Sequence, residues 1–347
     1  MDHLINHPGL ITGFAVVVIV MLLLDLGIFN KKSHVISNRE AAIWSVVWIS
    51  FSMIFSGFIY YTMGVEKFSQ FQSAYWIEKA LSVDNLFVFI MVFGFFNVPR
   101  GHQHKVLFWG IVGALILRAF FIFAGVGLIK LTYLPEMSIG GWNFILEHAE
   151  GVHIDYHGKQ FFRPNIILTL FGIFLIYAGI KSWFAEEDED ENKDFTKSPG
   201  AKVVYKLFKV SKNYDGDKFF TFENGKKLAT PLLVVVGVIE FTDLLFAVDS
   251  IPAIFAIAPD DPFILYTSNI FAILGLRSLY FLLANSIHLF NKLKYGLAVI
   301  LAFIGIKMVI APFYHIESLY SLIVVGGVLI LSIVASRLFP EKVIEKE

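Results

Sequence analysis

The sequence predicts an all-α membrane protein that crosses the bilayer about nine times. Of its 347 residues, 56% are hydrophobic and only 16% are charged, whereas soluble domains carry about 25% charged residues. The charged residues cluster in short gaps between long apolar runs. Each run is close to the roughly 20 residues that a membrane-spanning helix needs. A mean hydropathy of +0.68 agrees with this fold class.

The candidate spans follow one another along the whole chain. They cover residues 9–29, 41–63, 76–96, 104–130, 164–184, 231–258, 262–285, 292–312 and 317–338. Ser37 and Glu40 have the spacing of a capping box, which places a helix start just before the second span. We divide the chain into two N-terminal spans, a first three-span unit, a charged loop, a second three-span unit and a final span with its tail. The corresponding ranges are 1–75, 76–184, 185–229, 230–312 and 313–347.

Lysine and arginine residues fall in alternate gaps between the spans. The gaps after spans one, three, five and seven, together with the C-terminal tail, hold 20 of the 28 basic residues. The other gaps hold only Lys67, Lys159 and Arg163. Basic residues stay on the cytoplasmic side of a membrane, so we expect the N-terminus outside and the C-terminus inside.

The composition excludes several classes of function. The chain has no cysteine, which excludes disulfides, thiolate metal sites and cysteine nucleophiles. A net charge of −1 provides no basic field for nucleic acid. The spans contain no Ser-x-x-Lys, His-Glu-x-x-His or Gly-x-Ser-x-Gly arrangement. We therefore expect a protein that is not an enzyme.

Two long gaps carry charged or histidine side chains. The outer gap, 131–163, could recruit a metal at the surface or simply be solvated, and its candidate residues are Glu147, His148, Glu150, His153, Asp155 and His157. The inner gap, 185–229, opens with EEDEDE at 186–191 and continues with scattered lysines. Such a charge run is typical of a solvated face or a disordered linker, with regulatory metal sensing as the alternative.

Three short stretches in spans three to five match three stretches in spans six to eight, in the same order. The matches are EKALSVDN (78–85) with DLLFAVDS (243–250), LILRAFFIF (115–123) with LGLRSLYFL (274–282), and IYAGIKSW (176–183) with AFIGIKMV (302–309). Each unit has an odd number of spans, so the two copies would be inverted relative to each other. Inverted repeats with a site near the membrane midplane are a recurrent design of transporters.

Acidic residues within spans three and six need partners other than lipid. A charged side chain at the bilayer centre costs roughly 2.5–3.5 kcal/mol on insertion scales. One interpretation is simple ion pairing with the basic residues of the spans, which are Lys79, Arg118, Arg277 and Lys307. The other is a cation site, because carboxylates together with Asn85 and Ser250 form an all-oxygen set that suits hard cations such as Mg, Ca or Mn.

Helical geometry separates the acids into two pairs. Residues six apart on a helix differ by about 120° in direction. Glu78 and Asp84 therefore do not share a face, and neither do Asp243 and Asp249. We expect Asp84 and Asp249 to be the inner ligand pair. Glu78 and Asp243 would be acids at the entrance or beside the ligands, with Glu240 one turn before Asp243.

Two further features would serve ion binding and release. Pro252 cannot donate a hydrogen bond to the carbonyl of Val248, so we expect span six to break beside Asp249 and expose that carbonyl. Arg118 and Arg277 would occupy the acids when no ion is bound. That competition would help a cycle of alternating access.

The segments EKALSVDNLFVF (78–89) and TPLLVVVGVIEFTDLLFAVDSIPAIFA (230–256) resemble the paired signatures of the TerC family of integral membrane proteins, with Alx-type members the nearest match. The resemblance extends from LDLGIFNKK (24–32) to the final span. It implies a multi-pass protein of the cytoplasmic (inner) membrane, related to the LysE-type transporter superfamily. Family members are linked to manganese efflux, to supplying metal to exported enzymes and, by name, to tellurite resistance. The implied motif positions are Glu78, Asp84, Asn85, Glu240, Asp243, Asp249 and Ser250.

We therefore expect an exporter of divalent metal cations, with Mn(II) as the favoured substrate and no tightly bound cofactor. Proton exchange at the same carboxylates is left open. The alternative is a membrane factor that assists the metalation or assembly of exported proteins, together with the secretion machinery. The expected partners are the lipid bilayer and a divalent metal ion, and not nucleic acid. Tellurite chemistry has no support in the residues, because an oxyanion site needs convergent basic side chains.

Overall fold

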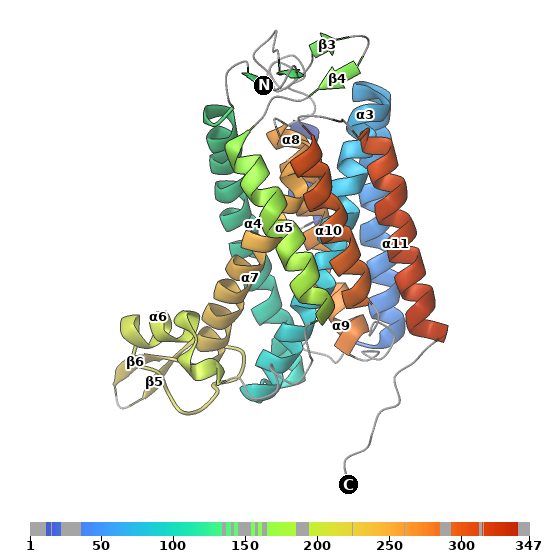
Figure 1. Ribbon diagram of the computed structural model, residues 1–347. Coiled ribbons are helices and arrows are strands. Elements are labelled where there is room, and N and C mark those ends of the chain that lie inside the picture. The colour runs from blue at the N-terminus through green and yellow to red at the C-terminus, as the bar shows by residue number, and fades with distance from the viewer. Residues whose placement is uncertain are drawn as a thin grey trace.

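The computed structural model describes most of the chain, and it is mainly helical (Figure 1). The described residues are 12–14, 16–21, 36–133, 137–139, 142–144, 154–156, 159–161, 165–184, 194–223, 225–259, 261–284, 293–311, 314 and 316–338. Long helices run side by side and form one bundle. This arrangement confirms the helical, multi-pass fold class.

Eight helices build the bundle within the described residues. They are α3 (Asn38–Phe95), α4 (Arg100–Leu131), α5 (Ile166–Phe184), α7 (Pro231–Phe255), α8 (Pro262–Leu274), α9 (Leu276–Ala284), α10 (Leu293–Ile310) and α11 (Ser318–Leu338). Six of these are long and apolar enough to cross a membrane, counting only the described part of the chain. The pair α8 and α9, bent by 40° at their junction, is a seventh candidate span.

Helix α3 is too long for a single crossing and turns back at a glycine. Gly64 has φ 86° and ψ 179°, a backbone conformation that glycine adopts far more readily than other residues. The side chain of Gln72, eight residues after Gly64, donates a hydrogen bond of 2.6 Å to Ser56, eight residues before it. Helix α3 is therefore a hairpin with a first arm (38–63) and a second arm (65–95).

The predicted spans are recovered in part. The two arms of α3 contain the predicted second and third spans, although the second arm begins well before the predicted residue 76. The span predicted at 262–285 is divided into α8 and α9 at Gly275. The first span, 9–29, lies largely outside the described residues, where only the helical stretch Thr12–Met21 is seen. The count of nine, the inverted repeats and the orientation of the termini stay predictions.

The predicted break in span six is wrong. Helix α7 continues through Pro252 and ends at Phe255, so the backbone beside Asp249 is helical. Pro252 lies in the last turn of α7, so the helix ends only one turn after the hydrogen bond that the proline ring removes. Pro252 still has no N–H to donate to the carbonyl of Val248, so the coordination of an ion by that carbonyl stays a prediction.

Side-chain caps define two helix starts. The predicted cap of α3 is confirmed, because the amide of Glu40 donates to Ser37 Oγ at 3.3 Å. Asp261 caps α8 in the same way, accepting a hydrogen bond from the amide of Ile264 at 3.1 Å. The Asp261 carboxylate also lies 2.6 Å from Lys67 Nζ. This ion pair joins the start of α8 to the second arm of α3.

Short strands lie at both ends of the bundle. Two antiparallel hairpins, β1 (Met137–Ile139) with β2 (Trp142–Phe144) and β3 (Ile154–Tyr156) with β4 (Lys159–Phe161), belong to the predicted outer gap. At the opposite end lies a small domain with η2 (Phe195–Lys197), α6 (Pro199–Leu207), β5 (Phe220–Glu223) and β6 (Lys226–Ala229) (Figure 1). The two long gaps therefore lie at opposite ends, as the predicted topology requires.

Residues 194–229, here called the α6 domain, are folded, whereas the sequence leaves both a solvated face and a disordered linker open for the gap 185–229. Strands β5 and β6 pair in antiparallel register, and the domain is attached to the bundle. Tyr214 donates a hydrogen bond of 2.7 Å to the carbonyl of Phe96. Lys105 Nζ lies 3.0 Å from the Asp217 carboxylate. For residues 194–229, the alternative of a solvated face therefore fits better than that of a disordered linker, because contacts with the bundle order the backbone while the lysine side chains stay exposed.

Some predictions for the long gaps fall outside the described residues. This applies to the acidic run 186–191 and to Glu147, His148, Glu150, His153 and His157. Asp155 lies in β3, but its side chain is not among those described. Metal recruitment at the outer gap and metal sensing at the inner gap stay predictions.

Helices α5 and α10 pack backbone to backbone. A Cβ atom added to Gly172 would lie 2.9 Å from the carbonyl oxygen of Gly305, and one added to Gly179 would lie 2.6 Å from that of Ala298. The contact residue number rises along α5, from 172 to 179, and falls along α10, from 305 to 298, so the two helices are antiparallel. Small residues at such contacts let membrane helices approach backbone to backbone.

Candidate functional site

A buried arginine joins acidic residues from two different helices. Arg118 of α4 donates through Nη1 to Oε1 of Glu78, which lies on the second arm of α3. Its Nη2 lies 3.2 Å from Oδ1 of Asp243 on α7. The relative exposures are 0% for Arg118, 0% for Glu78 and 4% for Asp243. Charges buried this deeply require partners, and these three side chains supply them to one another.

The cluster lies near mid-height in the bundle. Arg118 is residue 19 of the 32 in α4, and Asp243 is residue 13 of the 25 in α7. Glu78 is residue 14 of the 31 in the second arm of α3. The centre of a membrane would lie at about this level of the bundle. Ionised side chains are rare there and mark substrate or ion pathways.

Two residues outside the predicted site complete the cluster. Asn269 Oδ1, on α8, accepts from Arg118 Nη1 at 3.3 Å. Ser82 donates to Glu78 Oε1 at 3.4 Å, one helical turn further along α3. Both residues could have been predicted from the sequence. Ser82 has the four-residue spacing that places side chains on one helix face, and Asn269 is an amide within an apolar run, where a buried polar group needs a partner.

Several carboxylate oxygens of the cluster retain binding capacity. Arg118 contacts one oxygen of Glu78 and one of Asp243. Among the described side chains, no hydrogen-bond partner is found for the buried Glu78 Oε2, Asp243 Oδ2 and Glu240 Oε2. A buried polar atom without a partner costs roughly 1–3 kcal/mol, and more if it is charged. Oxygens of this kind are suitable ligands for a hard cation.

Glu240 reaches the neighbouring helix through a glycine. A Cβ atom added to Gly113 of α4 would overlap Glu240 Oε1, so the carboxylate lies directly against the α4 backbone. Glu240 precedes Asp243 by three residues and therefore lies one turn away on a similar face of α7. Because Gly113 has no side chain, the Glu240 carboxylate has room beside α4, the helix that carries Arg118.

Comparison with known proteins supplies the family. Residues 63–343 match the family described as "Integral membrane protein TerC family". The chain belongs to the TerC family. A membrane protein of Myxococcus xanthus, described as uncharacterised, is 42% identical over 96% of this chain and 93% of its own length. No solved structure matches.

Other TerC relatives carry the name Alx, with a provisional description as membrane-bound redox modulators. The Alx protein of Escherichia coli strain K12 is 41% identical over 95% of this chain and 94% of its own length. That of Photorhabdus laumondii is 41% identical over 95% of both chains. The resemblance noted in the sequence is therefore confirmed, and the chain is an integral membrane protein of this family.

The acidic positions of the TerC signatures are partly brought together. Glu78 and Asp243 are buried and meet at Arg118 in the middle of the bundle, and their role at an entrance or beside the ligands stays a prediction. Asn85 and Ser250 are also buried. The side chains of Asp84 and Asp249 lie outside those described, so their role as the inner ligand pair stays a prediction.

Arg118 takes the central position between the acids of this TerC protein. Among the described residues, no three or more acidic or histidine side chains converge on one point. The guanidinium instead occupies the space between Glu78 and Asp243. The ion-pair interpretation is thus correct for Arg118, and it leaves one oxygen of each acid for another ligand.

The other basic residues of the TerC spans have different positions. Lys79 Nζ donates to the carbonyl of Ala272 at 3.1 Å, near the C-terminal end of α8, where a cation is favourable. Lys307 is buried and contacts Ser321 Oγ at 2.8 Å. Arg277, matched to Arg118 by the repeat, is buried in the first turn of α9. Lys79 and Lys307 thus stabilise helix contacts.

Proposed function

We propose that this TerC family member exports a divalent metal cation across the cytoplasmic membrane, with Mn(II) as the favoured substrate. The observation that carries the proposal is the buried cluster of Glu78, Arg118 and Asp243, in which each acid keeps one oxygen without a described partner. An all-oxygen set suits hard cations such as Mn(II). The ion would enter from the cytoplasm and leave on the outer side. No tightly bound cofactor is required.

Arg118 would act as an internal competitor of the transported ion. When a cation binds Glu78 and Asp243, the guanidinium must leave one or both of them. Each acid would then have a positive partner in both the ion-free and the ion-bound state. No unpaired carboxylate would remain at the membrane centre, where it is costly. Protons compete for the same oxygens, so proton exchange belongs to the proposal as a coupling mechanism.

The contact between α5 and α10 supports inverted repeats. The repeat aligns Gly179 with Gly305, which lies 126 residues later, and the same interval aligns Gly172 with Ala298. Gly172 contacts Gly305, and Gly179 contacts Ala298, so exchanging the two repeats converts one contact into the other. This is the symmetry expected across a pseudo-two-fold axis in the membrane plane. Rocking of the two units about this contact would provide alternating access.

The second candidate is a membrane factor that assists the metalation or assembly of exported proteins. The folded α6 domain favours it, because an ordered surface at the end of a bundle can dock a partner. Removing residues 185–229 separates the two functions. A transporter would keep some flux, whereas an assembly factor would lose its partner. The chain has no cysteine, so a thiol of this chain cannot be the basis of a redox effect.

The proposal is tested by manganese flux into sealed inside-out vesicles. The variants are Glu78→Gln, Asp243→Asn, Asp84→Asn and Asp249→Asn, each checked for normal folding. Glu66→Gln is the matched control, because Glu66 lies on the same arm of α3 as Glu78 but is exposed. We expect the flux of the unaltered protein to be lost in the four variants and retained in the control.

Two results would oppose the proposal. If the unaltered protein carries no manganese, calcium or magnesium under any imposed gradient, the assembly factor becomes the better hypothesis. If flux is present and unchanged in all four acid variants, transport stands but the acids are not its path.

A further inference from the structure

Helix α6 has an apolar face that the described part of the protein does not cover. Ala201 and Val204 point inward, and a Cβ atom added to Gly237 of α7 would lie 2.7 Å from Val204. Val203 and Leu207, one turn apart on another face, are 55% and 67% exposed. Together with the exposed Phe208, these side chains form an apolar surface of the kind that marks membrane or protein contacts.

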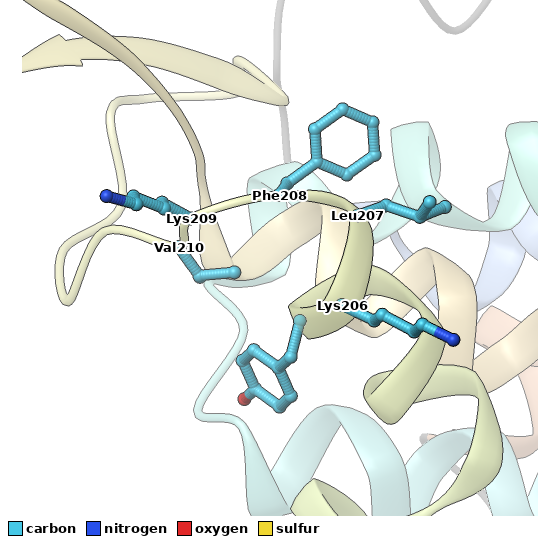
Figure 2. Close-up of a pocket in the computed structure, with 6 residues that line it drawn as sticks. Lys206, Leu207, Phe208, Lys209 and Val210 are labelled. Carbon is cyan, nitrogen blue, oxygen red and sulfur yellow. The ribbon is translucent and has the colours of Figure 1, made fainter.

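Lysines flank the exposed apolar face. Lys202 and Lys206 are also one turn apart, and both are exposed. Figure 2 shows Lys206 and Leu207 extending to the same side of the helix end, whereas Phe208 and Lys209, which follow them, extend in other directions. The residues from Tyr205 to Val210 line an open hollow of about 670 Å³. Apolar side chains bordered by lysines are typical of a helix that lies in a membrane interface.

The whole α6 domain is basic. Residues 194–229 contain eight lysines and four acidic residues, which gives a net charge of +4. Anionic lipids of the cytoplasmic leaflet attract such segments when these lie close to the membrane surface. The charge therefore complements a lipid headgroup layer.

The position of α6 fits the edge of a bilayer. Figure 1 shows α6 lying across the bundle axis beside the first turns of α7. Trp109 of α4 is 47% exposed nearby, and its ring lies 6.4 Å from that of Phe219 in the α6 domain. Tryptophan is enriched at membrane–water boundaries. An exposed tryptophan of the bundle therefore lies beside the α6 domain, at the level expected for a membrane boundary.

We propose that α6 is an interfacial helix that binds the headgroups of anionic phospholipids. Val203, Leu207 and Phe208 insert at the level of the upper acyl chains. The ammonium groups of Lys202, Lys206 and Lys209 contact lipid phosphates. This surface is separate from the Glu78–Arg118–Asp243 cluster, and the inference does not depend on the proposed export activity.

The absence of cysteine allows a direct test, because Leu207→Cys introduces the only thiol of the chain. The full-length variant is labelled with an environment-sensitive fluorophore and placed in nanodiscs of phosphatidylcholine, with or without phosphatidylglycerol. Spin-labelled lipids then report whether the probe contacts the membrane. Lys226→Cys, exposed at the start of β6, is the control position. We expect quenching at residue 207 to be several-fold stronger than at residue 226, and stronger with the anionic lipid.

A second variant tests the role of the lysines. Lys202→Gln, Lys206→Gln and Lys209→Gln are combined with Leu207→Cys, and the expected result is loss of the dependence on phosphatidylglycerol. The proposal is overturned if the probe at residue 207 is not quenched in either lipid mixture. It is also overturned if quenching is independent of anionic lipid, or if the probe is shielded only after a soluble protein fraction is added.

Discussion

Glu78 and Asp243 lie 165 residues apart in the chain and contact the same guanidinium, that of Arg118. The internal repeat aligns these two acids with each other. Their convergence on one cation means that neither can lose its partner without affecting the other. An ion that replaced Arg118 would therefore contact an acid of the first three-span unit and an acid of the second at the same time.

Replacing Arg118 with glutamine should destabilise the protein strongly. Two buried carboxylates would lose their counter-charge, and breaking a buried ion pair from one side costs roughly 3–5 kcal/mol. The measurement is thermal unfolding of the purified protein in detergent. Adding Glu78→Gln and Asp243→Asn to Arg118→Gln should restore most of the lost stability, because no unpaired buried charge then remains. If the triple variant is no more stable than the single one, the charges are not the cause.

Gly113→Ala should impair transport through Glu240. The new methyl group would overlap the Glu240 carboxylate, which must then move away from α4. We expect a large fall in manganese flux with little change in protein yield. Gly127→Ala is the matched control on the same helix, because no atom lies within 4 Å of a Cβ atom there. Equal flux in the two variants would show that the position of Glu240 does not matter.

Gly64→Ala should weaken the hairpin of α3. The backbone there has φ 86° and ψ 179°. A residue with a side chain is destabilised in this conformation by roughly 1–3 kcal/mol. The loss is measured as a lower unfolding temperature. Gly57→Ala, in the first arm with open space around it, should be neutral or slightly stabilising, because alanine favours a helix. A stable Gly64→Ala protein would argue against a fixed turn at this residue.

Attachment of the α6 domain to α4 should weaken only in strong acid. The hydrogen bond from Lys105 lowers the pKa of the Asp217 carboxyl below its usual value. A lowered pKa in the folded state gives stability that is present above the unfolded pKa of about 3.9 and is lost as the pH falls through the folded value. We therefore expect attachment to be constant from neutral pH down to about 4.

Hydrogen exchange of residues 214–219 can follow this attachment as a function of pH. The effect should be small, because Asp217 is largely exposed and solvent screens the pair. Asp217→Asn is the control and should show faster exchange without a step in acid. A step near neutral pH in the unaltered protein would identify a different titrating group.

Much of the site follows from the sequence because of the physics of the membrane. A carboxylate within an apolar run must find a partner, so the sequence alone assigns Glu78 and Asp243 to the protein interior. The cap at Ser37 is predictable for a similar local reason, since its oxygen bonds within one turn of the same chain. The TerC signatures are contiguous segments, and they identify the family without tertiary information.

The sequence by itself thus determined the helical membrane fold, the family and the buried acids, because each depends on composition or on neighbours along the chain. Only the tertiary structure decided that Arg118 serves both acids, that Asn269 joins them and that Gly113 makes room for Glu240. It also decided that residues 194–229 fold and that α7 continues through Pro252. These features depend on which helix faces meet, and the rotation and packing of helices are set by contacts between distant segments.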